Sequence, residues 1–502
     1  MRLPKHVLLG AQSISVATLL VLGSATSPAQ SQEASVLTYH WKPDRSGNFI
    51  APALTWANAR SVHLDQEFRA QFSGHIYAQP LYWEQPGQQS GTIIVATESD
   101  EVFALDSITG QQRWKRSLGN PIARDDLPCG DIDPLGITGT PVIDASKQAL
   151  YLSALVEQPN GPSHLVFGLS LSDGSLLSGW PVDVADALRA NAQRFNPRTQ
   201  NQRGALTILD GMVYVPLGGH FGDCGDYHGW VVGFPLDKPQ SVRAWSTRAR
   251  GGGIWAPGGI SSDGHSLYVA TGNTFGADTW SDGEAVFRLA LDLRRTDQKQ
   301  DFFAPSNWRT LDNRDADLGG TNPLPIDVTT NGTTQSLVLA LGKDGHAYLL
   351  DRANLGGIGG QLAERRVSEE PIRTAPATFP ATDGAFVAFQ GEGTDCPSHQ
   401  RDGDLTVLHI RAGSPPTITT AWCGAVGGRG SPIVTTTDGH SNPIVWMLGA
   451  EGDDRLHAFR GDTGEPLFTS EALTGLRRFQ TLIVARNRIY VGADGHVYAF
   501  GF

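Results

Sequence analysis

The chain has 502 residues, with 59 glycines, 30 prolines and only 18% charged residues, a composition that excludes coiled coils and helix bundles. The apolar fraction of 40% is enough for a core and excludes general disorder. The net charge is −12 and becomes −14 when residues 1–29 are removed, because Arg2 and Lys5 are the only charged residues there. This acidic balance indicates no nucleic-acid partner and no polybasic membrane patch.

Residues 1–29 have the pattern of an export signal. Two basic residues precede an apolar run from Val7 to Ala25, and the small residues Ser27 and Ala29 favour cleavage after Ala29. A membrane anchor is the alternative, but the apolar run is short and interrupted by polar residues. We therefore expect an exported protein, periplasmic or secreted, with no membrane span. Oxidising surroundings favour two disulfides among the four cysteines, which are Cys129, Cys224, Cys396 and Cys423.

A repeat first becomes legible at residues 92–114. A β-branched run, Thr92–Thr97, is followed by Val102–Asp106, a Thr109-Gly110 turn and Trp114, which predicts strand, turn, strand, turn, strand. Copies recur about every 57 residues, the scale of a propeller blade with some enlarged loops. The later copies span 149–180, 213–245, 267–308, 337–351, 386–422, 444–468 and 489–500.

Another short strand precedes nearly every copy, as at Thr138–Ile143 and Gly319–Pro323, so each unit has four strands. Eight such units predict an all-β fold, an eight-bladed β-propeller of four-stranded antiparallel blades, with residues 30–502 as a single domain. The last copy lacks its outermost strand. We expect the N-terminal strand Val36–Trp41 to complete that blade and close the ring. The alternative, an array of β-sandwiches, does not explain the repeated motif.

The segment Val102–Asp106, with Thr109-Gly110 and Trp114, resembles the repeat of the pyrroloquinoline quinone (PQQ) family of eight-bladed propellers. The resemblance covers essentially the whole mature chain. It implies the fold rather than an activity, because the same repeat occurs in propellers that bind no quinone.

The middle of the chain resembles quinoprotein alcohol dehydrogenases more specifically. Gly251–Trp255, Ala270–Asn273, Asp315–Gly320 and Gly342–Gly345 follow one another in the order seen in those enzymes. The resemblance implies that PQQ and Ca²⁺ are the cofactors. It also implies a role for each of four residues: Trp255 stacks under the quinone, Asn273 ligates the calcium, Asp317 is the catalytic base beside the metal, and Lys343 contacts the quinone.

Two features of the dehydrogenases are missing. Their adjacent pair of cysteines is replaced by the single Cys129, and the segment that should carry their metal-binding Glu contains only Asp223 and Asp226 as acidic residues. Either Asp is a candidate replacement for that ligand. Because the family brings the positions of Cys129 and Cys224 to the same mouth of the central channel, the resemblance implies a disulfide between them. Cys396 and Cys423 then form the second pair, as a structural staple in the sixth unit.

The segments that enter the inner strands carry basic residues, which we expect to surround the channel mouth together with Lys343. Such a ring predicts a funnel that attracts a small anionic or polar ligand, and surface salt bridges are the alternative. The residues are His75, Arg203, Arg373, Arg429 and Arg478, of which Arg203, Arg373 and Arg429 are candidate cofactor contacts.

Two functions remain open from the sequence. The first is a PQQ- and calcium-dependent dehydrogenase of alcohols or sugars. It would need a separate electron acceptor, because the chain has no haem-attachment motif, and no nicotinamide fingerprint is present. The second is a non-catalytic secreted propeller that binds a small anion, a glycan or a protein. A transition-metal cluster within His220–His228 is a further alternative, although an oxidised Cys224 would be lost as a ligand.

Overall fold

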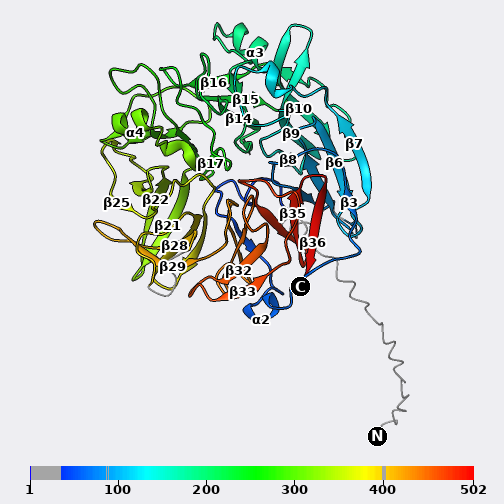
Figure 1. The fold of residues 1–502 in the computed structure, drawn as a ribbon, viewed down its shortest axis with the longest axis vertical. Helices are drawn as coiled ribbons and strands as arrows, with labels where there is room; N and C mark the ends of the chain where they lie inside the picture. Colours follow the sequence, from blue (N-terminus) through cyan, green and yellow to red (C-terminus); the bar gives the residue numbers. More distant parts are fainter. Residues whose placement is uncertain (2–34, 86, 89, 398–402) are drawn as a thin grey trace.

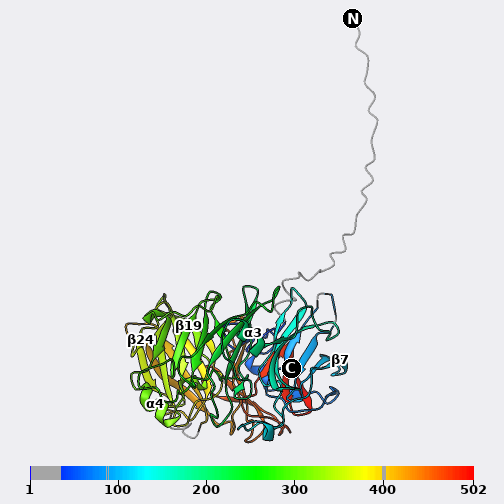
Figure 2. The ribbon, with the colours of Figure 1, turned by 90° about the horizontal axis from the view of Figure 1, so that it is seen from above.

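The computed structural model describes residues 1, 35–85, 87–88, 90–397 and 403–502. Eight small β-sheets follow one another around a common axis and form a ring (Figure 1). Seen from the side, the ring is a thick disc (Figure 2). The predicted eight-bladed propeller is therefore confirmed. The predicted export signal lies outside the described residues except for Met1.

Residues 81–304 form the first four blades, and a later two-residue strand, Gly357–Ile358, is added to blade 4. Blade 1 contains β4 (Leu81–Trp83), β5 (Thr92–Ala96), β6 (Glu101–Asp106) and β7 (Gln112–Ser117). Blade 2 contains β8 (Val142–Asp144), β9 (Ala149–Gln158), β10 (Gly161–Ser170) and β11 (Val182–Asp183). Blade 3 contains β13 (Thr207–Leu209), β14 (Met212–Gly219), β15 (Trp230–Pro235), β16 (Arg243–Ser246) and the short β12 (Gln200–Asn201). Blade 4 contains β17 (Ser261–Ser262), β18 (Leu267–Thr271), β19 (Ala285–Leu289), β20 (Phe302–Ala304) and β24 (Gly357–Ile358).

The other four blades complete the ring. Blade 5 contains β21 (Leu324–Thr330), β22 (Thr333–Leu341), β23 (His346–Asp351) and β25 (Ala363–Arg366). Blade 6 contains β26 (Ala377–Ala381), β27 (Gly384–Gln390), β28 (Leu405–Arg411) and β29 (Thr417–Gly424). Blade 7 contains β30 (Ile433–Thr436), β31 (Ile444–Leu448), β32 (Leu456–Arg460), β33 (Pro466–Thr469) and the added β1 (Asn48–Ile50). Blade 8 contains β34 (Leu482–Ala485), β35 (Arg488–Ala493), β36 (His496–Gly501), β2 (His63–Leu64) and β3 (Ala70–Gln71).

Helices are short in the described part of the chain. They are α2 (Trp56–Ala59), α3 (Val184–Ala190), α4 (Trp308–Arg314) and the 3₁₀ turns η1 (Arg124–Asp126), η2 (Lys299–Asp301) and η3 (Leu318–Gly320). Within the described ranges, none is both long enough and apolar enough to cross a membrane.

Tryptophans of the outer strands join neighbouring blades. Trp114 of β7 donates its indole N–H to the carbonyl of Leu171 at 3.0 Å, and its ring covers Gly174 in the next blade. Trp422 of β29 donates its indole N–H to the carbonyl of Gly461 at 2.7 Å, and its ring covers Gly464 in the next blade. A Cβ at either covered glycine would lie within 2.7 Å of the indole, so the turn must be glycine for the large apolar ring to pack there.

The N-terminal part of the chain closes the ring, but the predicted strand was wrong. Blade 8 is completed by β2 and β3, which pair antiparallel with β36 through Leu64↔Phe500 and Ala70↔Val497. Val36 instead bridges Tyr82 of β4 in blade 1. The closing strand therefore lies about thirty residues later in the chain than the sequence indicated.

Residues 35–51, here called the axial segment, lie against the first strands of several blades, within the ring in Figure 1. Its backbone accepts hydrogen bonds from Ile143 in blade 2, Ser262 in blade 4, Thr378 in blade 6 and Val434 in blade 7. Arg45, which is fully buried, donates to the carbonyls of Leu206 and Ile260. The axial segment therefore fills part of the central channel.

Candidate functional site

Four residues predicted to belong to the site meet at the carboxylate of Asp317, just before η3. Trp255 Nε1 donates to Asp317 Oδ2 at 3.1 Å, and Lys343 Nζ donates to the same oxygen at 2.9 Å. The backbone N–H of Asn273, beyond the end of β18, donates to Asp317 Oδ1 at 2.9 Å. Segments from blades 3–5 thus converge on one buried carboxylate, which is 4% exposed.

Glycines let these segments approach one another. A Cβ at Gly272 would lie 2.9 Å from Asp317 Oδ1 and 3.2 Å from Trp255 Nε1. A Cβ at Gly320 would lie 2.6 Å from the carbonyl of Ile372 and 3.6 Å from the Trp255 ring. The glycines of the Thr-Gly-Asn and Leu-Gly-Gly sequences are therefore needed for the packing of the site.

Lys343 lies beside the aromatic face of Trp255. Its ammonium is 5.6 Å from the ring centroid and also forms an ion pair of 2.7 Å with Asp315. Burial alone would lower the pKa of Lys343, but the carboxylates of Asp317 and Asp315 outweigh it and raise the pKa above its usual value. The side chain is only 11% exposed, so a flat aromatic surface and a fixed positive charge lie together.

Glu284 belongs to the same cluster and was not predicted. It follows the Asp282-Gly283 turn, and its Oε2 accepts the backbone N–H of Leu318 at 2.6 Å. Its Oε1 has no hydrogen-bond partner among the described residues. Burial, and then the charge of Asp317, raise the pKa of Glu284 well above its ordinary value, which favours the neutral acid. In the sequence, the signal for Glu284 was an acidic residue directly after Asp282-Gly283, a dipeptide typical of turns.

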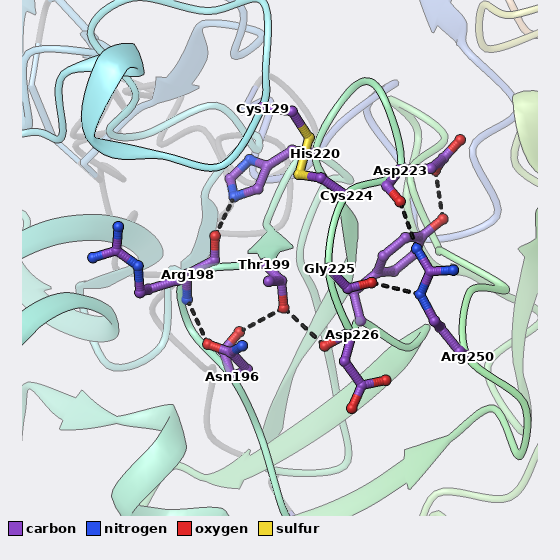
Figure 3. The surroundings of a disulfide bond; sticks show 11 residues. Cys129, Asn196, Arg198, Thr199, His220, Asp223, Cys224, Gly225, Asp226 and Arg250 are labelled. Carbon is purple, nitrogen blue, oxygen red and sulfur yellow. Dashed lines mark hydrogen bonds between the residues drawn. A yellow bond between two sulfur atoms is a disulfide. The ribbon is translucent and has the colours of Figure 1, made fainter.

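The disulfide between Cys129 and Cys224 is present, with the two Cα atoms 6.1 Å apart (Figure 3). It joins the loop after η1 to the segment between β14 and β15. The second predicted disulfide, Cys396–Cys423, is present too. Both predicted pairings are confirmed.

Asp223, next to Cys224, faces the cluster around Asp317. It accepts the hydroxyl of Tyr227 at 2.5 Å, and burial raises its pKa, with further contributions from Asp317 and Asp315. The guanidinium of Arg250 donates to the backbone carbonyls of Asp223 and Gly225 and holds this loop (Figure 3). The first bridge therefore lies close to the Trp255–Lys343 cluster.

The alternative ligand Asp226 points away from Asp223 and is 80% exposed (Figure 3). The described residues contain no group of three or more His, Cys, Asp and Glu side chains placed to hold a metal. Asp317 already accepts three hydrogen bonds, including one from an ammonium. The Asp317 carboxylate is therefore occupied by hydrogen-bond donors, and these surroundings do not fit a calcium site of the dehydrogenase kind.

The predicted funnel divides into two parts. Arg203 and Arg478 both pair with Asp131, and their guanidinium groups lie 5.8 Å and 6.0 Å from the ring of Phe479. His75 pairs with Asp494 at 2.7 Å. Arg373 and Arg429, by contrast, form no ion pair with any residue that the structure describes.

The basic residues without such partners are Arg373, at the entry to blade 6, and Arg429, at the entry to blade 7. The carbonyl of Ile372 lies against Gly320, which also lies beside Trp255 and Lys343. This contact places the Arg373 segment beside the cluster. The backbone of Arg429 in turn pairs with Phe479.

No family model and no curated protein matches the chain. Solved structures do match, and dehydrogenases are among them. A quinohemoprotein alcohol dehydrogenase from Comamonas testosteroni has 14% identity and a TM-score of 0.62, over 93% of this chain and 80% of that one. A europium-containing methanol dehydrogenase has 13% identity and a TM-score of 0.63, over 94% of this chain and 99% of that one.

The quinohemoprotein alcohol dehydrogenase ADHIIG from Pseudomonas putida HK5 has 13% identity and a TM-score of 0.64, over 95% of this chain and 82% of that one. At these identities the similarity shows the fold: the chain is a quinoprotein-like eight-bladed propeller.

Proposed function

We propose that the protein is an exported quinoprotein-like propeller that binds a flat polyanion against Trp255, and that PQQ is the ligand to test first. The observation that carries the proposal is the contact set of Trp255, Asp317 and Lys343. An aromatic face offers stacking area to a planar ring, and an ammonium fixed beside it attracts a carboxylate or quinone oxygen. Two disulfides are consistent with the oxidising compartment that export implies.

Each residue has a defined part in this binding. Asp317 holds the Trp255 indole and the Lys343 ammonium in place through one oxygen, so the platform and the charge are oriented before the ligand arrives. Arg373 and Arg429 supply further positive charge on the neighbouring blades. The Cys129–Cys224 bridge and Arg250 hold the Asp223 loop, whose carboxyl group is within electrostatic range of Asp317.

Dehydrogenation of an alcohol or a sugar is the second candidate, favoured by the position of Asp317 beside the platform. A bound quinone would supply the two-electron acceptor, and Asp317 would take the substrate proton as general base. The two electrons would then pass to a separate acceptor. Non-catalytic binding of a small anion, a glycan or a protein remains the outcome if the quinone binds without turnover or does not bind.

The test is binding of PQQ to the purified mature protein, followed by quinone absorbance and by isothermal titration. We expect Trp255→Leu to weaken binding about tenfold or more, because stacking on an aromatic ring contributes about 1–3 kcal/mol. The matched control is Trp308→Leu on α4, which should leave the affinity unchanged.

Absence of PQQ binding at micromolar concentration by the folded protein would refute the quinone ligand. Binding that Trp255→Leu does not weaken would refute the platform. Bleaching of the bound quinone by alcohols or sugars decides between the catalytic and the non-catalytic form.

A further inference from the structure

The turn between β5 and β6 in blade 1 contains two buried carboxyl groups, Glu98 and Asp100, each 0% exposed. Glu98 Oε2 accepts the backbone N–H of Gly136 at 2.8 Å. Glu98 Oε1 and both carboxyl oxygens of Asp100 have no hydrogen-bond partner among the described residues. Three buried oxygens without partners are costly, so the arrangement requires an explanation.

The corresponding turns of blades 6 and 8 do not share this feature. In blade 6, Asp404 accepts three backbone N–H groups at 2.7–3.1 Å, from Val426, Gly427 and Gly428. In blade 8, Asp494 accepts the backbone N–H of Ile76 and pairs with Arg477 and His75. In blades 6 and 8 the carboxylate at this turn is therefore satisfied by the next blade. In blade 1, as at Glu284 in the β18–β19 segment of blade 4, buried carboxyl oxygens have no partner among the described residues.

The carboxyl groups of Glu98 and Asp100 both lie beside Gly136. Gly136 bonds Glu98 through its N–H, and a Cβ placed on Gly136 would lie 2.5 Å from Asp100 Oδ1. Thr138 lies two residues further on and is 3% exposed. Its hydroxyl oxygen is also without a hydrogen-bond partner among the described residues. Burial raises the pKa of Glu98 to about 7, and the nearby Thr138 hydroxyl is among the groups that lower it, so this hydroxyl faces the Glu98 carboxyl.

Neighbouring basic residues do not neutralise the pair. Arg203 and Arg477 are within electrostatic range of Glu98. Arg203, however, is 3.8 Å from Asp131, and Arg477 pairs with Asp494. Burial and the proximity of Glu98 raise the pKa of Asp100 to about 9. Two acidic groups therefore lack a matching positive charge.

We propose that Glu98, Asp100 and Thr138 form a binding site for a hard divalent cation, Ca²⁺ or Mg²⁺. The available donors are four oxygen atoms, with no nitrogen or sulfur among them, which is the ligand chemistry of these two ions. Two carboxylates match the charge of one divalent cation, and water completes the coordination. Ser99, between the two acidic residues, is partly exposed, so the site is near the surface. The site is distinct from the Trp255–Asp317 cluster and does not depend on the proposed function.

The test uses the full mature chain after dialysis against a chelator. Titration with Ca²⁺ and with Mg²⁺ is followed by calorimetry and by thermal unfolding. We expect one ion to bind per chain, with a Kd at or below about 1 mM, the upper range for extracellular calcium modules, and with a rise in Tm. Asp100→Asn should abolish the binding, and Thr138→Val should weaken it about tenfold.

Asp317→Asn is the matched control, because it removes the acidic centre of the other cluster and should leave the binding intact. The proposal is overturned if neither ion binds, or if binding survives Asp100→Asn. It is overturned as well if binding disappears in Asp317→Asn, which would place the ion in the other cluster. If Asp100→Asn does not fold, the nearly isosteric Thr138→Val variant decides the question. Unchanged affinity of this variant for Ca²⁺ and Mg²⁺ would overturn the proposal.

Discussion

At the scale of single residues, the ion pair between Lys343 and Asp317 carries the candidate site. Both side chains are nearly buried, at 11% and 5% exposure, and Asp317 also holds Trp255. Removing one partner of a buried pair leaves the other charge uncompensated, whereas removing both charges leaves none.

We expect Lys343→Met to lower the free energy of unfolding by about 3 kcal/mol, because Asp317 then loses its ammonium partner. The double variant Lys343→Met with Asp317→Asn should recover part of that loss. Urea denaturation of the wild type, both single variants and the double variant measures the coupling. Equal and additive losses would contradict the assigned pairing.

A second prediction at this scale concerns His164, whose Nε2 is 2.9 Å from the carbonyl of Gln200. Burial lowers the pKa of His164 to about 4. Above pH 6.5 the imidazole is neutral in both the folded and the unfolded chain. As the pH falls from about 6.5 to 4, only the unfolded chain takes up the proton, so the free energy of unfolding falls by about 3 kcal/mol.

His164→Gln should therefore flatten the loss of stability between pH 6.5 and about 4, since glutamine does not titrate. His63, which is exposed, is the control: His63→Gln should leave the slope unchanged. Chemical denaturation at a series of pH values provides the measurement, and an unaltered slope in His164→Gln would count against the assigned cause.

At the scale of elements, a glycine turn of one blade supports a tryptophan of its neighbour. Gly464 has φ +75, and a Cβ there would lie 2.6 Å from the Trp422 ring, whereas Gly439 has φ +96 and open space around it. Both positions strain an alanine backbone, but only the first also displaces an indole.

We expect Gly464→Ala to lower the free energy of unfolding by at least about 1 kcal/mol more than Gly439→Ala. Trp422 is 1% exposed, and its displacement disturbs the contact between blades 6 and 7. Thermal unfolding of the two variants gives the comparison, and equal losses would show that the backbone strain alone accounts for the cost.

Much of the element scale could be predicted from the sequence. The apolar strands, the Thr109-Gly110 turn and the outer Trp114 repeat with a regular spacing, and such local patterns identify blades. The closing strands β2 and β3 have two residues each and no such pattern, whereas Val36–Trp41 looks like a strand and lies in the channel. Pairing across more than four hundred residues leaves no local signal.

The candidate site follows the same rule. Trp255, Asn273, Asp317 and Lys343 stand in motifs, and the structure brings them together. Glu98 and Asp100 belong to an ordinary turn sequence. Only the three-dimensional contacts reveal that their oxygens lack partners within the described part of the chain.

At the scale of the whole molecule, the axial segment links blades that are far apart in the ring. Arg45 donates four hydrogen bonds of 2.6–3.0 Å, to the carbonyls of Tyr39, Leu206 and Ile260 and to the Thr38 hydroxyl, and no carboxylate pairs with it in the described structure. Burial lowers its pKa to about 10, which still leaves it charged at neutral pH. One cation thus satisfies acceptors from two blades at the axis.

Arg45→Met should cost about 3 kcal/mol or more of the free energy of unfolding, because buried carbonyls lose their donors. Arg60→Met is the control: Arg60 and its partner Glu465 are both about half exposed, so its loss should cost less than about 1 kcal/mol. Guanidinium denaturation of both variants tests the difference, and similar small losses would mean that water replaces the Arg45 contacts.

The closure of blade 8 has a consequence for the order in which the protein forms. The strands β2 and β3 are among the first to be synthesised, and their partner β36 is the last strand of the chain. While blades 1–7 are being made, these two early strands have no sheet to join. A growing chain is therefore an open arc, and β2 and β3 can form their hydrogen bonds only once β36 has been made.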